Sequence, residues 1–451
     1  MTELAQLTRL GLFDAKVPRY TSYPTANHFS TAVQNRAFAD WLEAVPEGDA
    51  VSLYVHIPFC RRLCWFCACR TQGVRSDQPV KSYLGTLMEE IGMIGQRLPE
   101  GVRLTRLHWG GGTPTILSPD QISRLTAAIR RAIPFAEEIE FSVEVDPNEV
   151  DDDRLDALAA AGMNRASIGI QDFDPKIQAA IGRDQSFEIT REVAGKLRAR
   201  GIRSLNTDIL YGLPFQDARR IADTTRRLIS LAPDRVALYG YAHVPWMARR
   251  QTMIPEGELP DSEARLGLYE RARDLFLDAG YTAIGIDHFA RPGDGLDRAL
   301  AEGRLRRNFQ GYTDDTCATL IGAGASAISR FRQGYVQNIS ATASYLAQIR
   351  DGGFAAARGH AFSDEDRLRA RVIEELMCAF SADLDRIEAE FDAPPCDLRA
   401  EFARIGQKFA PFTQHRGGVL EITGAGKSLA RMIAREFDAY SISDKGHSLA
   451  I

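Results

Sequence analysis

The sequence lacks several features that would place it in a special class of protein. No run of about 18 apolar residues occurs among its 451 residues, so no membrane-spanning helix is expected. The first residues, MTELAQLTRLGLF, lack the apolar core of a signal peptide. The net charge is −5 with both signs mixed, so the basic footprint of a nucleic-acid-binding protein is missing. Seven cysteines, an odd number with four crowded together, argue against a disulfide framework, and we expect a cytoplasmic protein.

The crowded cysteines are the most informative feature of the sequence. Cys60, Cys64, Cys67 and Cys69 follow an apolar, β-rich run that Pro58 ends. The spacing C-x3-C-x2-C is neither the C-x2-C pair of a structural zinc site nor a ferredoxin run, in which four cysteines complete the ligand set. Three thiolates can hold three irons of a [4Fe–4S] cube and leave the fourth iron open for chemistry. Zinc binding and buried thiols are the alternatives on spacing alone.

The remaining cysteines have less defined roles. Cys69 stands two residues after Cys67, a spacing at which both reach one cube only awkwardly. Cys69 is therefore either a residue that takes part in the reaction or a simple buried thiol. Cys317, Cys378 and Cys396 are isolated in the sequence, and we expect them to be packing residues.

From residue 51 the chain alternates strands and helices with unusual regularity. The apolar pattern predicts six strands, and a further apolar run at 281–287 extends the series. Alternation of this kind gives parallel strands with right-handed crossovers, in a doubly wound sheet or an open barrel. The predicted strands span 51–57, 104–109, 139–145, 165–170, 202–211 and 236–241.

The unusual residues of this region favour a partial (β/α)6 barrel over a doubly wound sheet. They gather at the carboxyl ends of the predicted strands, where (β/α) barrels place their active sites. These residues are Cys60, Gly110 to Gly112, Glu144, Asp146, Gln171, Asp208 and residues 241–243.

The two ends of the chain differ from this central region. Residues 1–50 form an N-terminal arm with one predicted helix at 34–45, and the aromatic segment 18–29 is either surface coil or a cover over the substrate. Residues 51–360 form the barrel with its rim loops, of which 288–360 reads as irregular. Residues 361–451 predict a small, mostly helical accessory domain with one strand at 419–422 and a final helix from about 427 to 440.

The glycine run and two carboxylates each have a functional and a structural interpretation. Three glycines after a strand let the backbone approach a ligand, or they form a tight turn. Glu144 and Asp208 end apolar runs, where an unpaired carboxylate is costly to bury. Ribose hydroxyls, a ligand ammonium or Arg183 would offset the cost of burying these carboxylates. A structural ion pair within the protein is an equal alternative.

Taken together, the motifs resemble the oxygen-independent coproporphyrinogen III oxidase family of radical S-adenosylmethionine (SAM) enzymes. The resemblance covers essentially the whole length of the chain. The stretches that carry it include PRYTSYPTA (18–26), YVHIPFC (54–60), HWGGGTPT (108–115), QDF (171–173), DILYGLP (208–214), YAHVPWM (241–247), DHFARP (287–292), NFQGYT (308–313) and GAGASAIS (322–329).

The resemblance implies cofactors and residues that bind them. It implies a [4Fe–4S] cluster on Cys60, Cys64 and Cys67, two SAM molecules, and catalytic positions at Cys69 and Tyr54. The implied SAM contacts are Tyr54, Phe66, Gly111, Gly112, Thr113, Glu144, Gln171, Arg183, Asp208, Ala242 and Ile328.

The implied reaction is anaerobic and uses coproporphyrinogen III. Reductive cleavage of SAM gives a 5′-deoxyadenosyl radical, which takes a hydrogen from the β-carbon of a propionate. Loss of carbon dioxide and one electron leaves a vinyl group, and two such events give protoporphyrinogen IX. A low-potential donor such as flavodoxin or ferredoxin is expected as partner, and the chain is expected to be a monomer.

Two other functions stay open on the sequence. One is a haem chaperone of the same family, although its pattern lacks the cysteine corresponding to Cys69 and the segment at 18–26. The other is a related radical SAM enzyme that degrades or methylates haem. His243 and His288 are possible substrate contacts. Arginines predicted near the rim could bind propionates or form an ordinary solvated surface; they are Arg249, Arg250, Arg291, Arg306 and Arg307.

Overall fold

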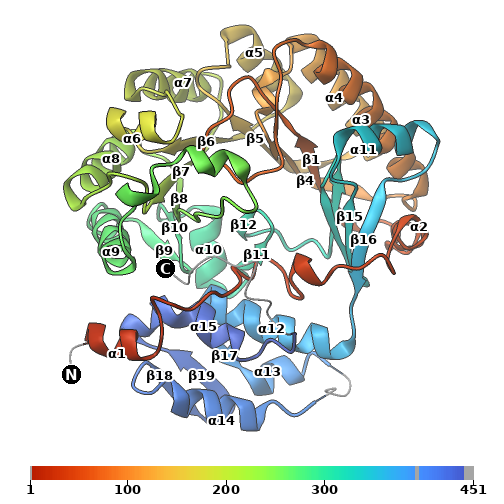
Figure 1. Ribbon diagram of the computed structural model, residues 1–451. Coiled ribbons are helices and arrows are strands. Elements are labelled where there is room, and N and C mark those ends of the chain that lie inside the picture. Colours follow the sequence, from red (N-terminus) through yellow and green to blue (C-terminus); the bar gives the residue numbers. More distant parts are fainter. Residues whose placement is uncertain (1–2, 392–395, 441–451) are drawn as a thin grey trace.

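A twelve-stranded sheet forms the centre of the computed structural model, which describes residues 3–391 and 396–440. The strand order is β16-β15-β14-β13-β1-β4-β5-β6-β7-β8-β10-β9. Helices cover the outer face of its curved central part, and the accessory domain lies against one side of the barrel (Figure 1). No helix of the described ranges is both long and apolar enough to cross a membrane.

Six parallel strands in chain order make the predicted partial (β/α)6 barrel. Each pairs in parallel with the next, so the predicted fold is confirmed. The strands are β1 (Ala50–Ile57), β4 (Arg103–Gly111), β5 (Phe135–Val145), β6 (Arg165–Gln171), β7 (Ser204–Tyr211) and β8 (Arg235–Gly240). The outer helices are α3 (Gln78–Arg97), α4 (Pro119–Ala132), α5 (Asp152–Ala161), α6 (Pro175–Ala180), α7 (Phe187–Ala199), α8 (Ala218–Ser230) and α9 (Ser262–Asp278).

Local sequence sets the ends of these helices as expected. The Ser118 hydroxyl accepts from the Gln121 backbone N–H, and the Gln121 side chain accepts from the Ser118 N–H, which forms a capping box at the start of α4. Asp151 caps α5, and Gly162 ends it with a φ of 98°. These residues therefore place the start of α4 and both ends of α5 where the sequence predicts them.

The segment after α9 differs from the prediction. The run at 281–287 is not a seventh parallel strand, because β9 (Thr282–Ile284) and β10 (His288–Ala290) form an antiparallel edge. Residues 288–360 are not irregular either, since β13 pairs in parallel with β1 and three antiparallel strands follow it. These elements were missed because most are only three to five residues long; they are α10 (Gly295–Ala301), β11 (Arg306–Asn308), β12 (Gly311–Thr313), β13 (Thr319–Ala323), β14 (Ile328–Phe331), β15 (Gly334–Asn338), α11 (Thr342–Arg350) and β16 (Ala356–Ala361).

The accessory domain contains more strand than predicted. A three-stranded sheet, β17-β19-β18, packs with its helices, and the predicted final helix is only α15 (Ala430–Arg435) after a 3-10 turn at Gly424–Leu429. The predicted domain runs to residue 451, and 441–451 lie outside the described residues. The other elements are α12 (Asp364–Ala379), β17 (Ser381–Asp383), α13 (Leu384–Glu388), α14 (Arg399–Lys408), β18 (Thr413–Arg416) and β19 (Val419–Ile422).

The N-terminal arm joins the barrel to the accessory domain. It carries α1 (Glu3–Arg9) and α2 (Asn35–Glu43), of which only α2 was predicted. Between them, Arg19 Nη2 donates to the Gly240 carbonyl at 2.8 Å, on the barrel. The Tyr20 hydroxyl donates to Asp438 at 2.9 Å, on the accessory domain. The arm therefore lies across the junction of the two domains.

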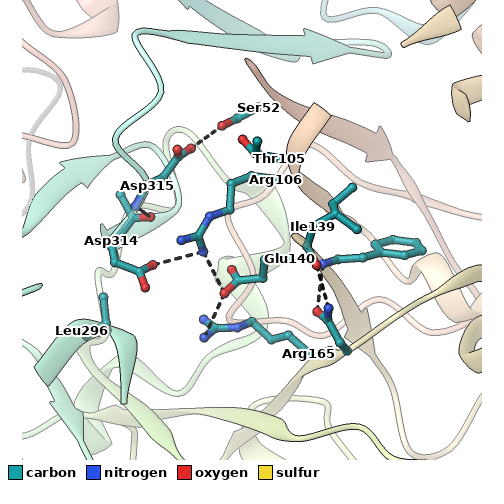
Figure 2. A network of polar contacts seen from close by, with 12 residues as sticks. Ser52, Thr105, Arg106, Ile139, Glu140, Arg165, Leu296, Asp314 and Asp315 are labelled. Atoms are coloured by element: carbon teal, nitrogen blue, oxygen red, sulfur yellow. Dashed lines mark hydrogen bonds and ion pairs between the residues drawn. The ribbon is translucent and has the colours of Figure 1, made fainter. Parts of the chain in front are cut away.

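A network of ion pairs closes the barrel at the amino-terminal ends of its strands. Arg106 contacts Glu140 at 2.7 Å and Asp314 at 3.1 Å, and Arg165 contacts Glu140 at 3.4 Å (Figure 2). Arg235 pairs with Asp294 at 2.7 Å, with both side chains buried. Charges from six segments thus hold the end of the barrel opposite the predicted site.

Replacing Asp294 by alanine tests whether this network stabilises the barrel. Asp294→Ala removes the closer of the two carboxylate partners of the buried Arg235 guanidinium, leaving only Asp314 at 3.6 Å, and it removes the cap of α10, so the free energy of unfolding should fall by about 3–5 kcal/mol. Glu43→Ala is the control, since its 2.6 Å pair with Arg97 is about half exposed and should cost less than about 1 kcal/mol. Urea denaturation measures both, and equal losses would contradict this role.

Candidate active site

The predicted site residues lie together at the carboxyl-terminal rim of the barrel. Most stand towards the end of a parallel strand or just beyond it, and neighbouring strands are hydrogen-bonded in chain order, whereas Arg183 lies between α6 and α7 and Ile328 begins the antiparallel β14. The side chains that point into the barrel are polar along much of its length. Tyr54 and His108 stack with ring centroids 5.7 Å apart, and Asn206 Nδ2 donates to Asp208 at 3.0 Å. The placement predicted from the strand ends is therefore confirmed.

A loop at residues 58–78 carries all four cysteines and is tied to the rim by backbone contacts. β2 (Phe59–Cys60) pairs in parallel with β3 (Gln72–Gly73), which closes the base of the loop. The Trp65 N–H donates to the Ile181 carbonyl at 2.8 Å. Gln251 Nε2 donates to the Phe66 carbonyl at 2.8 Å. The cysteines are thus presented from a fixed backbone.

The four thiols have different environments. Burial raises the pKa of Cys60 to about 11, and a hydrogen bond with the Thr113 side chain opposes this shift. The Cys69 thiol donates to Cys67 and lowers the pKa of Cys67, whereas the pKa of Cys69 is raised well above its usual value by the same contact. Arg183 Nη1 donates to Cys64 Sγ at 3.4 Å. Because a thiolate is the metal-binding form, Cys67 is better prepared as a ligand than Cys69.

The glycine run is required by the protein itself. A Cβ on Gly112 would lie 2.6 Å from the Phe59 carbonyl oxygen, and one on Gly111 would lie 2.3 Å from the His56 ring. The Gly112 N–H donates to the Ile57 carbonyl, and the Gly111 N–H donates to Glu144 at 3.1 Å. Side chains are therefore excluded by close packing at the end of β4. A ligand at this run would be contacted through carbonyl oxygens.

The two carboxylates at the strand ends form no structural ion pair with Lys or Arg in the described part of the chain. Glu144 contacts His108 Nε2 at 3.4 Å and accepts from the Gly111 N–H. Removal of Asp208 from water raises its pKa to about 6, although Asn206 donates to it. Arg183, the predicted protein partner, instead donates to the Gly169 carbonyl and to Gln185. A ligand at the rim is the interpretation that remains for these acids.

The other predicted SAM contacts are also held at the rim. The Tyr54 hydroxyl bonds His56 Nδ1 at 3.0 Å, and Gln171 adopts a φ of 70°, a strained conformation often seen at functional sites. Gln251 donates to the carbonyls of both Ala242 and Phe66, so it joins the end of β8 to the cysteine loop. Nothing in the sequence signalled this role of Gln251.

Ile328 follows a rim loop that α3 ties to β1. Glu90 accepts from the Gly324 N–H at 2.7 Å, and the Tyr83 hydroxyl accepts from the Ala325 N–H at 2.9 Å. Tyr83 also donates to the His56 carbonyl at 2.8 Å. These contacts hold this loop beside β1. The loop then leads into β14, which begins at Ile328.

A cavity of about 860 Å³ lies between the rim, the N-terminal arm and the accessory domain. It is lined by tyrosines and cations, and it reaches the rim at Ala242. Its lining includes His243, as expected of a substrate contact, but His288 bonds Asp287 instead. The tyrosines are Tyr211, Tyr239, Tyr241 and Tyr269, and the cations are Lys16, Arg19, Arg265, Arg273, Lys427 and Arg431.

The arginines singled out from the sequence do not line this cavity. Arg307 is buried against Asp287 at 3.5 Å, and Arg306 lies 3.8 Å from Glu374. Arg250 donates to the Cys69 carbonyl, and Arg249 begins the adjoining 3-10 turn. Arg291 lies at the opposite end of the barrel, beside the start of β8, so its predicted place near the rim is wrong. The cavity takes its cations from segments far apart in the sequence, which spacing could not reveal.

Comparisons with known proteins agree over the whole chain. Residues 54–228 match the family model of the Radical SAM superfamily. The chain is 58% identical to the oxygen-independent coproporphyrinogen III oxidase of Paracoccus denitrificans, with 100% of both chains covered. A relative of the same name from Cereibacter sphaeroides is 54% identical over 99% of both chains. The chain belongs to the oxygen-independent coproporphyrinogen III oxidase family.

The architecture of a solved relative agrees with this membership. The structure described as coproporphyrinogen III oxidase (HemN) from Escherichia coli, a radical SAM enzyme, superposes with a TM-score of 0.88 at 37% identity. The alignment covers 95% of this chain and 100% of that chain. The oxidase fold therefore includes the arm and the accessory domain as well as the barrel.

Membership of the radical SAM superfamily implies a [4Fe–4S] cluster and SAM, and the cysteine loop fits the cluster. Cys60, Cys64 and Cys67 lie close enough for their charges to interact, on a loop with a fixed backbone. Among the described residues, no three or more His, Cys, Asp or Glu side chains gather around one point as a single metal ion requires. Thiolates on a cube bind different irons and need not converge in that way.

Four serine variants test the ligand assignment. Cys60→Ser, Cys64→Ser and Cys67→Ser should each lose most of the iron after anaerobic reconstitution, because each removes one thiolate. Cys69→Ser should keep the iron, since Cys69 retains its proton beside Cys67. Cys317→Ser, far from the loop in sequence, is the control. Iron and sulfide analysis measures the result, and equal iron loss in all four loop variants would refute the assignment.

The carboxylate of Asp208 gives a pH-dependent test of SAM binding. Its pKa of about 6 means that the carboxyl is neutral below that pH and accepts hydrogen bonds most strongly above it. SAM affinity should therefore rise as the pH increases from 5 to 7, and Asp208→Asn should weaken binding about tenfold at pH 8 and flatten this profile. Asp223→Asn, exposed on α8, is the control. Anaerobic calorimetry measures the affinity; unchanged binding in Asp208→Asn would remove Asp208 from the site.

Proposed function

We propose that this enzyme converts coproporphyrinogen III to protoporphyrinogen IX without oxygen, by decarboxylating two propionates to vinyl groups. The proposal is supported by identity of 54–58% over the full length to two proteins named for that activity. The names of these relatives do not favour a haem chaperone or an enzyme that degrades or methylates haem.

One observation carries the proposal, the cation-lined cavity that meets the rim. Its volume of about 860 Å³ is in the range of sites for large ligands, and its tyrosines offer flat surfaces for a macrocycle. Six lysines and arginines against three acidic side chains suit a substrate with four carboxylates. The acidic side chains are Asp261, Glu270 and Asp287.

Residues of three segments would bind and enclose the substrate. Lys16 and Arg19 come from the arm, Arg265 from α9, and Lys427 and Arg431 from the accessory domain. Arginines bind carboxylates in two-point contacts, so these residues would set the orientation of the propionates. We propose that the arm, within residues 1–50, covers the substrate and excludes water, since Lys16 and Arg19 line the cavity.

The cofactors supply the difficult chemistry at the rim. When bound, the cluster, which Cys60, Cys64 and Cys67 would hold, and SAM would supply the radical chemistry that removes a hydrogen atom from the propionate β-carbon, with loss of carbon dioxide and one electron. We assign two SAM molecules to the rim contacts described above. Cys69 is exposed and its pKa is raised well above its usual value by its contact with Cys67, so it would hold a proton at the cysteine loop, while Tyr54 and His56 hold each other in position.

The remaining properties of the enzyme follow from this assignment. We propose a cytoplasmic monomer that takes electrons from a low-potential carrier such as flavodoxin or ferredoxin. Residues 51–360 supply the barrel, and residues 361–451 supply the accessory wall of the cavity.

Product analysis without oxygen tests the function. With a strong reductant, SAM and coproporphyrinogen III, the enzyme should release carbon dioxide and 5′-deoxyadenosine together, and the tetrapyrrole should lose two carboxyl groups through a mono-vinyl intermediate. Mass spectrometry follows the tetrapyrrole, and Cys64→Ser is the inactive control. A haem chaperone would leave the porphyrinogen unchanged, and a methyl-transferring or haem-degrading enzyme would give a mass gain or an opened ring. Turnover in air, or deoxyadenosine without decarboxylation, would overturn the proposal.

A further inference from the structure

The surface beside the cysteine loop has an unusual charge. The whole chain carries a net charge of −5, yet residues 58–78 contain four arginines and a single acid, Asp77, which pairs with Arg61. A second segment beside this loop, residues 241–255, contains two arginines and no acid. Arg62, Arg70 and Arg75 are exposed and form no ion pair in the structure as described. These two segments are therefore positive on an acidic protein, with Glu149 from the loop after β5 near enough to Arg62 for their charges to interact.

The same surface carries most of the exposed large apolar side chains of the described residues. Trp246 is 61% exposed, Met247 64% and Met253 58%, and only Leu4 and Leu277 share this class elsewhere. Three of five such side chains thus fall within eight residues. Water contact with this much apolar surface is unfavourable, and a local concentration of it marks an interaction site.

These apolar side chains are fixed next to the cysteine loop. Gln251 is buried and donates to the carbonyls of Phe66 and Ala242, while its own oxygen accepts from the Val244 N–H. Arg250 donates to the Cys69 carbonyl at 3.2 Å and to the Thr71 hydroxyl at 2.9 Å. The segment 244–253 is thus held rigidly against the chain that carries the cysteines.

From this arrangement we infer that a small, acidic electron-carrier protein docks on the cluster-side patch, which we define as Arg62, Arg70, Arg75, Trp246, Met247, Arg249 and Met253. This inference rests on the proposed function, because the reaction needs one electron from outside for each SAM that is cleaved. In the transfer the carrier loses one electron and the cluster gains it, with no atom exchanged. Opposite charge would steer the carrier to the patch, and the methionines and tryptophan would form the dry centre of the contact.

The position of the patch explains why the carrier would bind there. β3 pairs with Cys60, and the Val74 N–H donates to the Cys60 carbonyl at 3.0 Å, so Arg75 lies one residue beyond this contact. Arg62 stands between Cys60 and Cys64 in the loop, and Ala68 and Cys69 are exposed. A protein bound here would approach the cluster with only the loop between them. The outer helices would hold a carrier bound elsewhere farther away.

The test uses reconstituted enzyme and a reduced flavodoxin as the probe. One variant is Arg62→Glu with Arg75→Glu, and a second is Met247→Asp with Met253→Asp. The matched control is Arg131→Glu with Arg226→Glu, which makes the same charge change on α4 and α8, at exposed arginines without ion pairs. Calorimetry gives the flavodoxin dissociation constant, and turnover is measured separately with flavodoxin and with dithionite, a small reductant that needs no docking surface.

The arginine variant should raise the flavodoxin dissociation constant at least about tenfold at low salt, and the difference should shrink as salt screens the charges. The methionine variant should weaken binding to a similar degree at all salt concentrations. Iron content and dithionite-driven turnover should stay at the wild-type level in both, as should flavodoxin binding by the control.

Unchanged flavodoxin affinity in both patch variants would overturn the inference. So would an equal loss of dithionite-driven turnover, because the patch would then belong to the substrate site that Trp246 borders. Failure of the proposed function is distinguishable from either result, since wild-type enzyme with dithionite would then form no vinyl product while flavodoxin binding stayed measurable.

Discussion

Parallel pairing of β1 and β4 to β8 in chain order is the constraint on which the rest of the structure depends. It brings the carboxyl ends of six strands to one rim, so residues as far apart as Phe66 and Gln251, 185 positions along the chain, become neighbours. Each crossover helix packs its apolar face on the outside of the sheet, which leaves the inward-facing positions free to be polar. Site residues can therefore be supplied by short additions to each strand end.

The two ends of the barrel use polar side chains in different ways. At the amino-terminal end, arginines and acids neutralise one another, as Arg235 does with Asp294 at 2.7 Å. At the rim, Glu144 and Asp208 are held by neutral donors or by histidine and have no arginine or lysine partner within the described ranges. One end is thus satisfied by the protein alone, whereas the other leaves two carboxylates without a cationic partner from the described residues, as the proposed SAM site requires. The arm and the accessory domain then close the cavity above this rim.

The sequence predicted the barrel and the cysteine loop well because both depend on local signals. Strand–helix alternation, caps such as Ser118 and the C-x3-C-x2-C spacing are all readable within about twenty residues. It failed for β9 to β16, since these short strands, most of them with antiparallel pairing, depend on partners elsewhere in the chain, as β13 does on β1. It also failed for the cavity cations. Arg19 and Arg431 are 412 residues apart and meet only because the arm crosses to the accessory domain, where Arg431 donates to the Pro18 carbonyl at 3.1 Å.

For the glycine run, the sequence predicted the location correctly but explained the absence of side chains only in part. Its position at the rim was predicted, but close packing against Ile57, Phe59 and His56 excludes side chains there whether or not a ligand binds.

The central claim is that the cavity delivers a propionate of the substrate to the SAM-binding rim. The most direct test is hydrogen transfer from coproporphyrinogen III that carries deuterium at the propionate β-carbons. The account predicts deuterium in the 5′-deoxyadenosine formed during a single anaerobic turnover, in step with vinyl formation. Unlabelled 5′-deoxyadenosine, with the deuterium retained on the tetrapyrrole, would contradict it.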